Sequence, residues 1–230
     1  MTPPSPLTAL AAAICALALA GPASASLVTM QTRHATDTAP SLGSDALNGE
    51  YYRATVQALL ADAPTAGTCD AVVASFTGLS NQSVCGGGAS DLAFHFAVDF
   101  GLSGHEGHDF GVRIGPDFGR GGAVFLDGQL LGVRTQDMWW NGAYTQPGQY
   151  FEFDALGLLA GMHRLDVFGL EACCDGTQQA QFRLASGAAW KTFGDRDGLK
   201  AGAVPEPGAL ALALLALAAA AGIGRGNVPA

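Results

Sequence analysis

Residues 91–100 read Asp-Leu-Ala-Phe-His-Phe-Ala-Val-Asp-Phe and alternate strictly between two kinds of side chain. Five large apolar residues fall on one side: Leu92, Phe94, Phe96, Val98 and Phe100. The residues between them are small or polar. Because successive side chains of a strand point to opposite faces, this period of two predicts a half-buried strand.

The segments around this strand extend the same pattern. Residues 122–133 hold two short apolar runs joined by Asp127-Gly128, a dipeptide that tolerates positive φ and favours a hairpin. Further strands are expected at residues 150–154, 162–168 and 181–184, with Gly and Pro between them. A single short helix is expected at residues 51–61. Strands at a spacing of about ten residues indicate an antiparallel β-sandwich or jelly roll.

Composition limits the classes of function. The chain has 230 residues with a formal net charge of −9, and no stretch is rich in Lys or Arg. Since nucleic-acid binding needs clustered cations, the sequence argues against it. With 49% hydrophobic and 13% charged residues, the chain is not of the disordered type. Its length fits one domain with additional segments at the ends.

The first 25 residues have the features of a signal peptide. An apolar run at residues 7–20 is followed by Gly21-Pro22 and by the small residues Ala23-Ser24-Ala25. This order is typical of a secretory signal, so we expect residues 1–25 to be removed, with cleavage after Ala25. The alternative is a buried helix, which would show polar residues at helical spacing; this run shows none.

Residues 204–230 form a second terminal segment. Pro205, Glu206 and Pro207 precede an uncharged apolar stretch at residues 208–224, and Arg225 follows it. As a helix, such a stretch would span roughly 25 Å, just enough to cross a membrane. A cation after it suits an end held on the cytoplasmic side. A C-terminal core helix is the poorer alternative, because nothing polar marks an outer face.

This arrangement resembles the PEP-CTERM sorting signal of exported bacterial proteins. The matching residues are Pro205, Glu206, Pro207 and Arg225; the family usually ends in several Arg or Lys, whereas this chain has one. The resemblance implies processing by an exosortase-type membrane enzyme, transient membrane anchoring through the C-terminal helix, and a final place in the cell envelope or extracellular matrix. Residues 26–203 remain as one exported domain.

Four cysteines belong to the exported part: Cys69, Cys85, Cys173 and Cys174. An even count in an exported chain suggests two disulfides, and four cysteines allow three pairings. A bond between Cys173 and Cys174 is awkward, since consecutive Cα atoms lie about 3.8 Å apart, closer than the usual ~4.4–6.8 Å of a disulfide. We therefore favour a crossed pairing that joins Cys69 and Cys85 to the adjacent pair. A metal or redox thiol site is disfavoured, because there is no C-x-x-C and no His nearby in sequence.

Several short motifs within residues 26–203 are similar to protective-antigen-type and fibro-slime sandwich domains. They are Asn-Gly-Glu-Tyr-Tyr at 48–52, Val-Phe-Leu-Asp-Gly at 124–128, residues 156–161 and residues 165–168. Some members of these families bind glycans. The consecutive aspartates that often precede the hairpin there are absent here. Residues 173–176, Cys-Cys-Asp-Gly, also resemble the Cys-Cys-x-Gly feature of one group of PEP-CTERM proteins.

An aromatic segment after the hairpin is the candidate ligand site. It contains Trp139, Trp140 and Tyr144. Exposed Trp and Tyr rings stack against the apolar faces of sugars and offer polar edges for hydrogen bonds. Adjacent residues of an extended chain face opposite ways, so one tryptophan is expected in the core and the other at the surface.

Metal sites are weaker candidates. His105 and His108, with Glu106 or Asp109, could bind a metal, but a Gly-rich loop does not by itself supply convergent geometry. A solvated loop is the preferred interpretation. A Ca²⁺ site would need several oxygen ligands, and Asp109, Asp117 and Asp127 are widely spread in sequence. We therefore expect no resident cofactor, with Ca²⁺ as the alternative.

These features lead to three ranked functions. The first is a non-catalytic surface or matrix protein associated with exopolysaccharide and biofilm. The second is a glycan-binding module that uses residues 139–144. The third is a metal-dependent hydrolase built on His105 and His108. We do not expect an enzyme, because Ser103 stands in Gly-Leu-Ser-Gly-His and not in the G-x-S-x-G of a nucleophile elbow.

Overall fold

The computed structural model describes residues 25–35, 42–103 and 109–201. The expected signal peptide, the sorting motif and the C-terminal apolar stretch lie outside these residues, apart from Ala25. Within the described ranges, no helix has both the length and the apolar character needed to cross a membrane.

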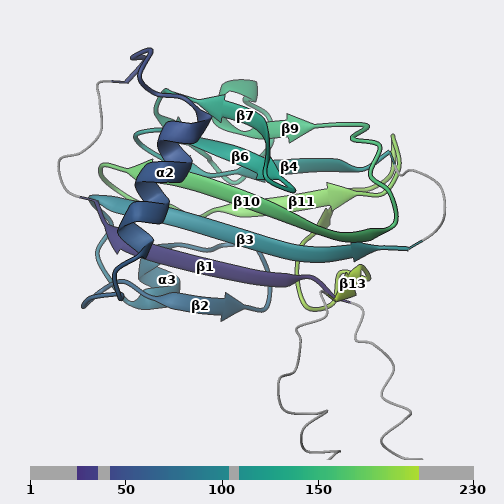
Figure 1. The fold of residues 1–230 in the computed structure, drawn as a ribbon, viewed down its shortest axis with the longest axis horizontal. Coiled ribbons are helices and arrows are strands. Elements are labelled where there is room, and N and C mark those ends of the chain that lie inside the picture. Colours follow the sequence, from purple (N-terminus) through teal and green to yellow (C-terminus); the bar gives the residue numbers. More distant parts are fainter. Residues whose placement is uncertain (1–24, 36–41, 104–108, 202–230) are drawn as a thin grey trace, which may run out of the picture.

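Two antiparallel sheets pack face to face (Figure 1). The larger sheet has the strand order β2-β1-β3-β10-β6-β7, and β13 pairs with β3 beside the start of β1. Its strands are β1 (Leu27–His34), β2 (Asp70–Val73), β3 (Leu92–Leu102), β6 (Gly122–Leu126), β7 (Gln129–Arg134), β10 (Gly161–Glu171) and β13 (Lys200–Ala201).

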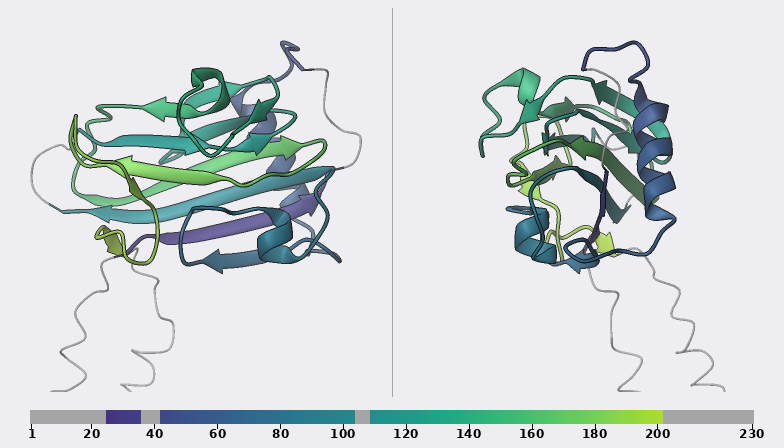
Figure 2. Two further views of the ribbon diagram at one scale, coloured as in Figure 1. Left: turned by 180° about the vertical axis from the view of Figure 1, so that it is seen from behind. Right: turned by 90° about the vertical axis from the view of Figure 1, so that its left-hand side faces the viewer.

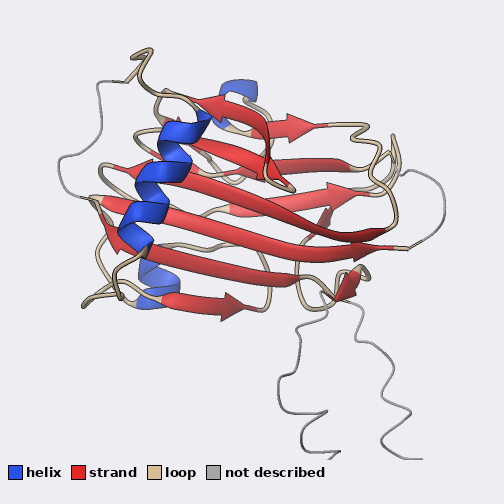
Figure 3. Ribbon diagram, viewed as in Figure 1, coloured by secondary structure: helices blue, strands red, loops and turns tan. Residues whose placement is uncertain are grey.

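The smaller sheet has the order β12-β11-β4-β9. Its strands are β4 (Gly111–Gly115), β9 (Phe151–Phe153), β11 (Gln179–Arg183) and β12 (Lys191–Thr192). A separate two-stranded ribbon joins β5 (Asp117–Phe118) to β8 (Met138–Trp139). The helical segments are α2 (Gly49–Leu60), α3 (Asn81–Cys85) and the 3₁₀ turn η1 (Pro147–Gln149). In Figures 2 and 3, α2 covers the outer face of the large sheet, so helix and sheets form three layers.

The strand predicted at residues 91–100 is β3, which lies in the middle of the large sheet, but both of its faces are buried. The large apolar residues at even positions from Leu92 to Leu102 lie in the core between the sheets. Ala93, on the other face, lies in a second core formed with α2. His95 and Ala97 on that face are also buried. The prediction of a half-buried strand is therefore wrong, because alternation identifies the two faces without showing that a helix and polar neighbours cover the second.

Helix α2 confirms the expected helix with slightly different bounds, but α3 shows that it is not the single helix that the sequence predicts. Asn48 caps it by accepting a hydrogen bond of 3.0 Å from the Tyr51 backbone N–H, which satisfies one of the free amide groups of the first turn. Tyr52 and Val56, four residues apart, are fully buried against the sheet. The Tyr52 hydroxyl donates to the Arg120 carbonyl at 2.9 Å. The helix is thus held by its apolar stripe and by side-chain hydrogen bonds, which include that of Tyr52 and one of 3.3 Å from Arg53 to the Gly128 carbonyl.

The predicted hairpin and the predicted strands are confirmed. Asp127 and Gly128 have φ angles of +50° and +77° and connect β6 to β7. The other three segments correspond to β9, β10 and β11, of which β10 is longer than expected. The sequence did not predict β1, β2, β4 or the two-residue strands.

The disulfides correct the crossed pairing. Cys69 is bonded to Cys85 with a Cα–Cα distance of 5.4 Å, and Cys173 is bonded to Cys174. Cys174 has a φ of +76°, which turns the chain sharply at this position. The adjacent bond that the Cα spacing made awkward is therefore present in a tight turn.

Hydrogen bonds around Thr32 explain the first disulfide. The Thr32 backbone N–H donates to the Cys69 carbonyl at 2.9 Å, so Cys69 is held against β1. The Thr32 hydroxyl donates to Asn81 at 2.7 Å, at the start of α3, and Cys85 ends that helix. Strand pairing and a short helix therefore bring Cys69 and Cys85 together without either late cysteine.

The chain enters and leaves the fold at one end of β3. Leu27 lies opposite Asp99, and Ala201 lies opposite Phe100. Glu171 lies opposite Leu92, at the other end of the same strand. At a rise of about 3.3 Å per residue, these two ends are about 25 Å apart.

Candidate functional site

The ribbon of β5 and β8 presents Trp139 to solvent. In its register Phe118 lies opposite Met138, and Asp117 lies opposite Trp139. Phe118 and Met138 are fully buried in the core between the sheets. Residues directly opposite each other share a face, so Asp117 and Trp139 lie on the outer one. Trp139 is 54% exposed, while its backbone N–H donates to the Gln149 side chain at 2.6 Å.

The next tryptophan has the opposite environment. Trp140 is 8% exposed, and its ring lies over the backbone of Gly115, where a Cβ atom would be 2.3 Å away. One tryptophan is thus in the core and one at the surface, as the alternation of the segment predicts. Only a glycine at position 115 leaves room for this ring.

Tyr144 packs on the outer face of the small sheet. Its ring lies 5.4 Å from that of Trp140 and 3.9 Å from the Arg113 guanidinium carbon. Its hydroxyl donates to the Gln179 carbonyl at 3.3 Å. Burial raises the pKa of Tyr144 well above its ordinary value. Of the three aromatic candidates, Trp139 is therefore the most available to a ligand.

Residues 171–176 cross the outer side of β5 and the turn that follows it. The Gly176 backbone N–H donates to the Asp117 carboxylate, and Glu171 accepts from the Gly119 N–H at 2.7 Å. A Cβ atom on Gly176 would lie 2.6 Å from an Asp117 carboxylate oxygen, so this segment rests directly on Asp117. Asp117 thus has Trp139 beside it on the ribbon and residues 171–176 over its carboxylate. We call Trp139 and this segment the distal surface.

Three carboxyl groups in or next to the distal surface have raised pKa values. Burial raises the pKa of Glu171 to about 7, although two backbone N–H groups donate to it and favour its ionised form. Burial likewise raises the pKa of Asp175 to about 6, with the Asn81 backbone N–H acting in the opposite direction. The pKa of Asp117 is also raised by burial. The Asp117 charge adds to both upward shifts.

The metal candidates separate in the structure. His105 and His108 lie outside the described residues, and Asp109 is exposed. Asp127 bonds to His163 at 2.7 Å on the hairpin, whereas Asp117 bonds to Gly176 at the distal surface. Across residues 25–35, 42–103 and 109–201, no three His, Cys, Asp or Glu side chains form a group suited to a metal ion.

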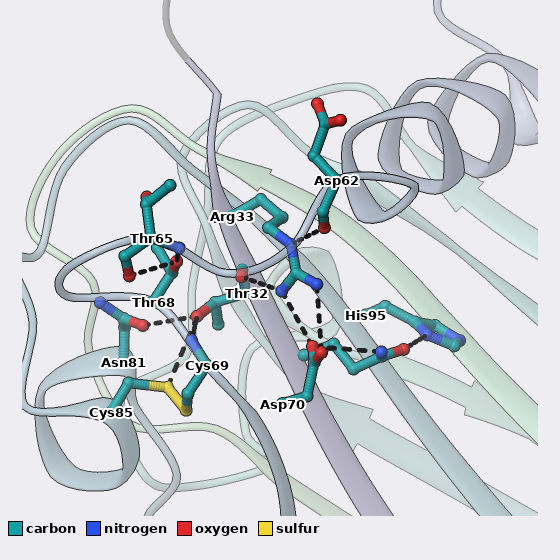
Figure 4. A network of polar contacts seen from close by, with 11 residues as sticks. Thr32, Arg33, Asp62, Thr65, Thr68, Cys69, Asp70, Asn81, Cys85 and His95 are labelled. Atoms are coloured by element: carbon teal, nitrogen blue, oxygen red, sulfur yellow. Dashed lines mark hydrogen bonds and ion pairs between the residues drawn. A yellow bond between two sulfur atoms is a disulfide. The ribbon is translucent and has the colours of Figure 1, made fainter.

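A second polar group lies on the outer face of the large sheet (Figure 4). Arg33, 5% exposed, donates to both oxygens of Asp70 at 2.8 and 3.1 Å. His95 lies between Gln31 and Asp166, with 2.9 Å from its Nδ1 to Gln31 and 2.8 Å from its Nε2 to Asp166. These contacts join β2, β1, β3 and β10. Because both ring nitrogens of His95 are occupied within the sheet, we assign the group a structural role.

We call this group, together with Arg164, which bonds to Asp166, the Arg33 network. Its hydrogen bonds and charges lower the pKa values of two carboxyl groups. A hydrogen bond from Arg33 holds the pKa of Asp70 below its ordinary value. Burial acts to raise the pKa of Asp166, but bonds and charge from His95 and Arg164 lower it overall. The network is therefore a set of matched opposite charges, unlike the carboxyl groups of the distal surface.

Sequence reasoning identified Trp139 but missed its neighbours. The sequence suggests Asp117 only as a calcium ligand, and Cys173 and Cys174 only as disulfide partners. The pairing of Asp117 with Gly176 spans 59 residues of sequence. The motif Cys-Cys-Asp-Gly is a signal that this segment is unusual, but it does not indicate which strand the segment covers.

Comparisons with known proteins give structural similarity alone. No family model matches the sequence, and no curated protein does. The fold is similar to the PA14 domain of the antifreeze protein MpAFP, at 10% identity and a TM-score of 0.48, covering 78% of this chain and 93% of that one. It is similar to the PA14 sugar-binding domain of an RTX adhesin, at 15% identity and a TM-score of 0.44, covering 78% and 100%. A third similar structure is the A domain of Candida glabrata epithelial adhesin 9 in complex with Galb1-4GlcNAc, at 9% identity and a TM-score of 0.41, covering 78% and 93%.

Proposed function

We propose that this protein is an exported, non-catalytic carbohydrate-binding module of a bacterial cell envelope or exopolysaccharide matrix. Trp139 carries the proposal. This residue is 54% exposed, while the two residues on the inner face of the same ribbon are fully buried. An indole ring stacks on the apolar face of a sugar. Because the ribbon is already ordered, little conformational entropy is lost when a ligand binds.

The position of Trp139 suits a protein held at a membrane by its C-terminus. Leu27 and Ala201 lie at one end of β3, and Glu171 of the distal surface lies at the other. A chain anchored beyond Ala201 would therefore present the distal surface away from its anchor. The similarity of the body to protective-antigen-type domains, some of which bind glycans, agrees with this function.

Catalysis by the distal carboxyl groups is a poorer explanation. A pKa of about 7 would suit Glu171 as a general acid. However, Glu171 is 1% exposed, and its two oxygens accept hydrogen bonds from the backbone of Gly119 and Cys173 at 2.7 and 2.8 Å. A carboxyl group enclosed in this way does not reach the glycosidic oxygen of a ligand on the surface.

The sorting part of the proposal concerns residues 204–230. Pro205, Glu206 and Pro207 would be the recognition element of an exosortase-type enzyme, and Arg225 would help to hold the apolar segment in the membrane before processing. Mass spectrometry of the mature protein tests this directly. We expect an N-terminus at Ser26 and a C-terminus near residue 205; an intact C-terminus ending at Ala230 in the exported protein would overturn it.

Affinity electrophoresis in gels with embedded polysaccharide tests the binding function. We expect the wild-type protein to be retarded by a neutral polysaccharide and Trp139→Ala to migrate as in a gel without it. Leu159→Ala is the matched control, because Leu159 is 67% exposed and precedes β10 at the opposite end of the fold. Equal retardation of the Trp139→Ala variant and the wild type would contradict the proposal.

A further inference from the structure

The Cys173–Cys174 disulfide is on the surface of the protein, in contrast to the first disulfide. Both residues are exposed. Cys174 has a φ of +76°, a backbone conformation that non-glycine residues rarely adopt. Strained backbone of this kind is retained where the surroundings impose it and is concentrated at functional sites. Nothing in the function proposed above uses this pair.

The surroundings hold the turn firmly. On its N-terminal side the Cys173 backbone N–H donates to Glu171 at 2.8 Å. On its C-terminal side the Asp175 N–H donates to the Ala89 carbonyl at 2.9 Å, and the Gly176 N–H donates to Asp117. The backbone on both sides of the disulfide is therefore hydrogen-bonded, while the two cysteines remain exposed.

Asp117 is a common neighbour of Trp139 and of the segment that holds the disulfide. Trp139 lies directly opposite Asp117 in the ribbon, where Cβ atoms are about 4.5–5.5 Å apart. The Gly176 backbone N–H donates to the Asp117 carboxylate, two residues after Cys174. A short oligosaccharide could therefore contact both. Disulfide sulfur is polarisable and apolar, and it suits contact with the C–H face of a sugar as aromatic rings do.

The charges of this region restrict the ligand. Asp117, Glu171 and Asp175 are buried in this region, and Asp137, directly before β8, is exposed. The nearby cation Arg120 is paired with Asp91. A ligand that carries carboxylates would bring further negative charge towards these partly desolvated groups, where like charges repel strongly. Uncharged sugars avoid this cost.

We propose that Trp139 and the Cys173–Cys174 disulfide are two apolar contacts of one binding surface that takes an uncharged polysaccharide and excludes uronate-containing chains. This inference rests on the proposed function and extends it by naming a second contact and a ligand class. The sulfur pair supplies the contact itself, and the tight turn aims it outward.

Two double variants separate the sulfur contact from the shape of the turn. Cys173→Ser/Cys174→Ser removes the sulfur atoms and the bond. Cys173→Ser/Cys174→Gly also removes them, but glycine adopts the positive φ of position 174 without strain. We expect both variants to bind laminarin or galactomannan about 5–10-fold more weakly than the wild type, an effect on the order of 1 kcal/mol. Melting temperatures measured in parallel monitor folding.

The outcomes distinguish a failure of this inference from a failure of the proposed function. Full affinity in the Cys174→Gly double variant would overturn the sulfur contact. Normal binding by both double variants, with binding lost in Trp139→Ala, would do the same and leave the proposed function standing. Binding of polygalacturonate as tight as that of the neutral chains would overturn the ligand class. Failure of the wild-type protein to bind either neutral polysaccharide would overturn the proposed function and this inference together.

Discussion

The Arg33 network and the distal surface contain the same kinds of groups in opposite arrangements. Each lies beside a disulfide and contains carboxyl groups that are buried or partly buried. Around Arg33 the carboxylates face cations, and the pKa values of Asp70 and Asp166 are lowered. At the distal surface they face backbone amides, and the pKa values of Glu171 and Asp175 are raised. The first arrangement stabilises strand pairing, whereas in the second no cation of the described residues pairs with Asp117, Glu171 or Asp175.

Removal of the two disulfides should show the largest contrast. Cys69 and Cys85 are separated by 16 positions, and a loop of about that size gives a chain-entropy stabilisation of about 3 kcal/mol. Cys173 and Cys174 are adjacent and close almost no loop. We therefore expect Cys69→Ser/Cys85→Ser to lower the free energy of unfolding by about 3 kcal/mol. Cys173→Ser/Cys174→Ser should lower it by less than about 1 kcal/mol. Urea unfolding measures both, and equal losses would remove the distinction.

Neutralising one carboxylate in each region should give the next largest difference. Asp70→Asn leaves the buried Arg33 without its ion pair, and we expect a loss of about 2–3 kcal/mol, since Asp70 itself is partly exposed. Asp117→Asn keeps an acceptor for the Gly176 N–H and removes a charge that burial disfavours. Its effect should be below about 1 kcal/mol.

Asp195→Asn, at an exposed position, is the control for these two variants. It should change the free energy of unfolding by no more than about 0.5 kcal/mol. A loss in Asp117→Asn as large as that in Asp70→Asn would show that Asp117 has a cationic partner.

The two regions should respond to pH in opposite directions. Raised pKa values mean that folding favours the protonated forms of Glu171 and Asp175. Their contribution to stability is complete below their ordinary pKa values and is lost as the pH rises through about 6 and 7. Asp70 and Asp166 contribute above their ordinary pKa values and lose that contribution as the pH falls. We expect the free energy of unfolding to fall by on the order of 2 kcal/mol between about pH 5 and 8.

Glu171→Gln/Asp175→Asn should remove most of this alkaline loss. The glutamine side chain introduced at position 171 would place an amide donor against a backbone N–H, so the variant should be less stable than the wild type at every pH. Glu152→Gln, at an exposed position of β9, is the matched control and should leave the pH profile unchanged. Parallel pH profiles for the wild type and the double variant would contradict the assignment of the loss to the distal surface.

The smallest expected effect is the coupling between the two regions. Asp70 bonds to Arg33 and Gln31, whereas Asp117 bonds to Gly176, so their hydrogen-bond partners differ. The effects of Asp70→Asn and Asp117→Asn should therefore add to within about 0.5 kcal/mol in the double variant. A larger coupling would indicate that α3, which lies between Thr32 and Asp175 through Asn81, transmits strain from one region to the other.

Local patterns predicted the elements whose signals are strong. The alternating strand at residues 92–100, the Asp127-Gly128 turn and the helix expected at residues 51–61 each correspond to an element that the structure contains. Strand β1 was not predicted, because Val28 and Met30 alternate with Thr29 and Gln31 over too short a run, next to an expected cleavage site. The disulfide pairing was wrong because strand pairing and α3 decide which cysteines meet.

The candidate site was predicted only in part, for a related reason. The alternation of adjacent residues separates Trp139 from Trp140, but it does not show which ring is exposed. That depends on Gly115, whose missing Cβ makes room for Trp140. The contact between Asp117 and Gly176 joins residues far apart in the chain. No periodic pattern in the sequence of either segment predicts it.

The sequence by itself determined that the chain is mainly β and where the strand at residues 91–100 and the hairpin lie. It also determined that one of two adjacent tryptophans is exposed. These properties follow from the period of a strand and from the φ angles that short turns need. The tertiary structure decided that both faces of β3 are covered, that Cys173 and Cys174 are bonded to each other, and that their segment contacts Asp117, the strand partner of Trp139. These outcomes depend on which segments pack together, and packing is a property of three-dimensional neighbours that no local pattern records.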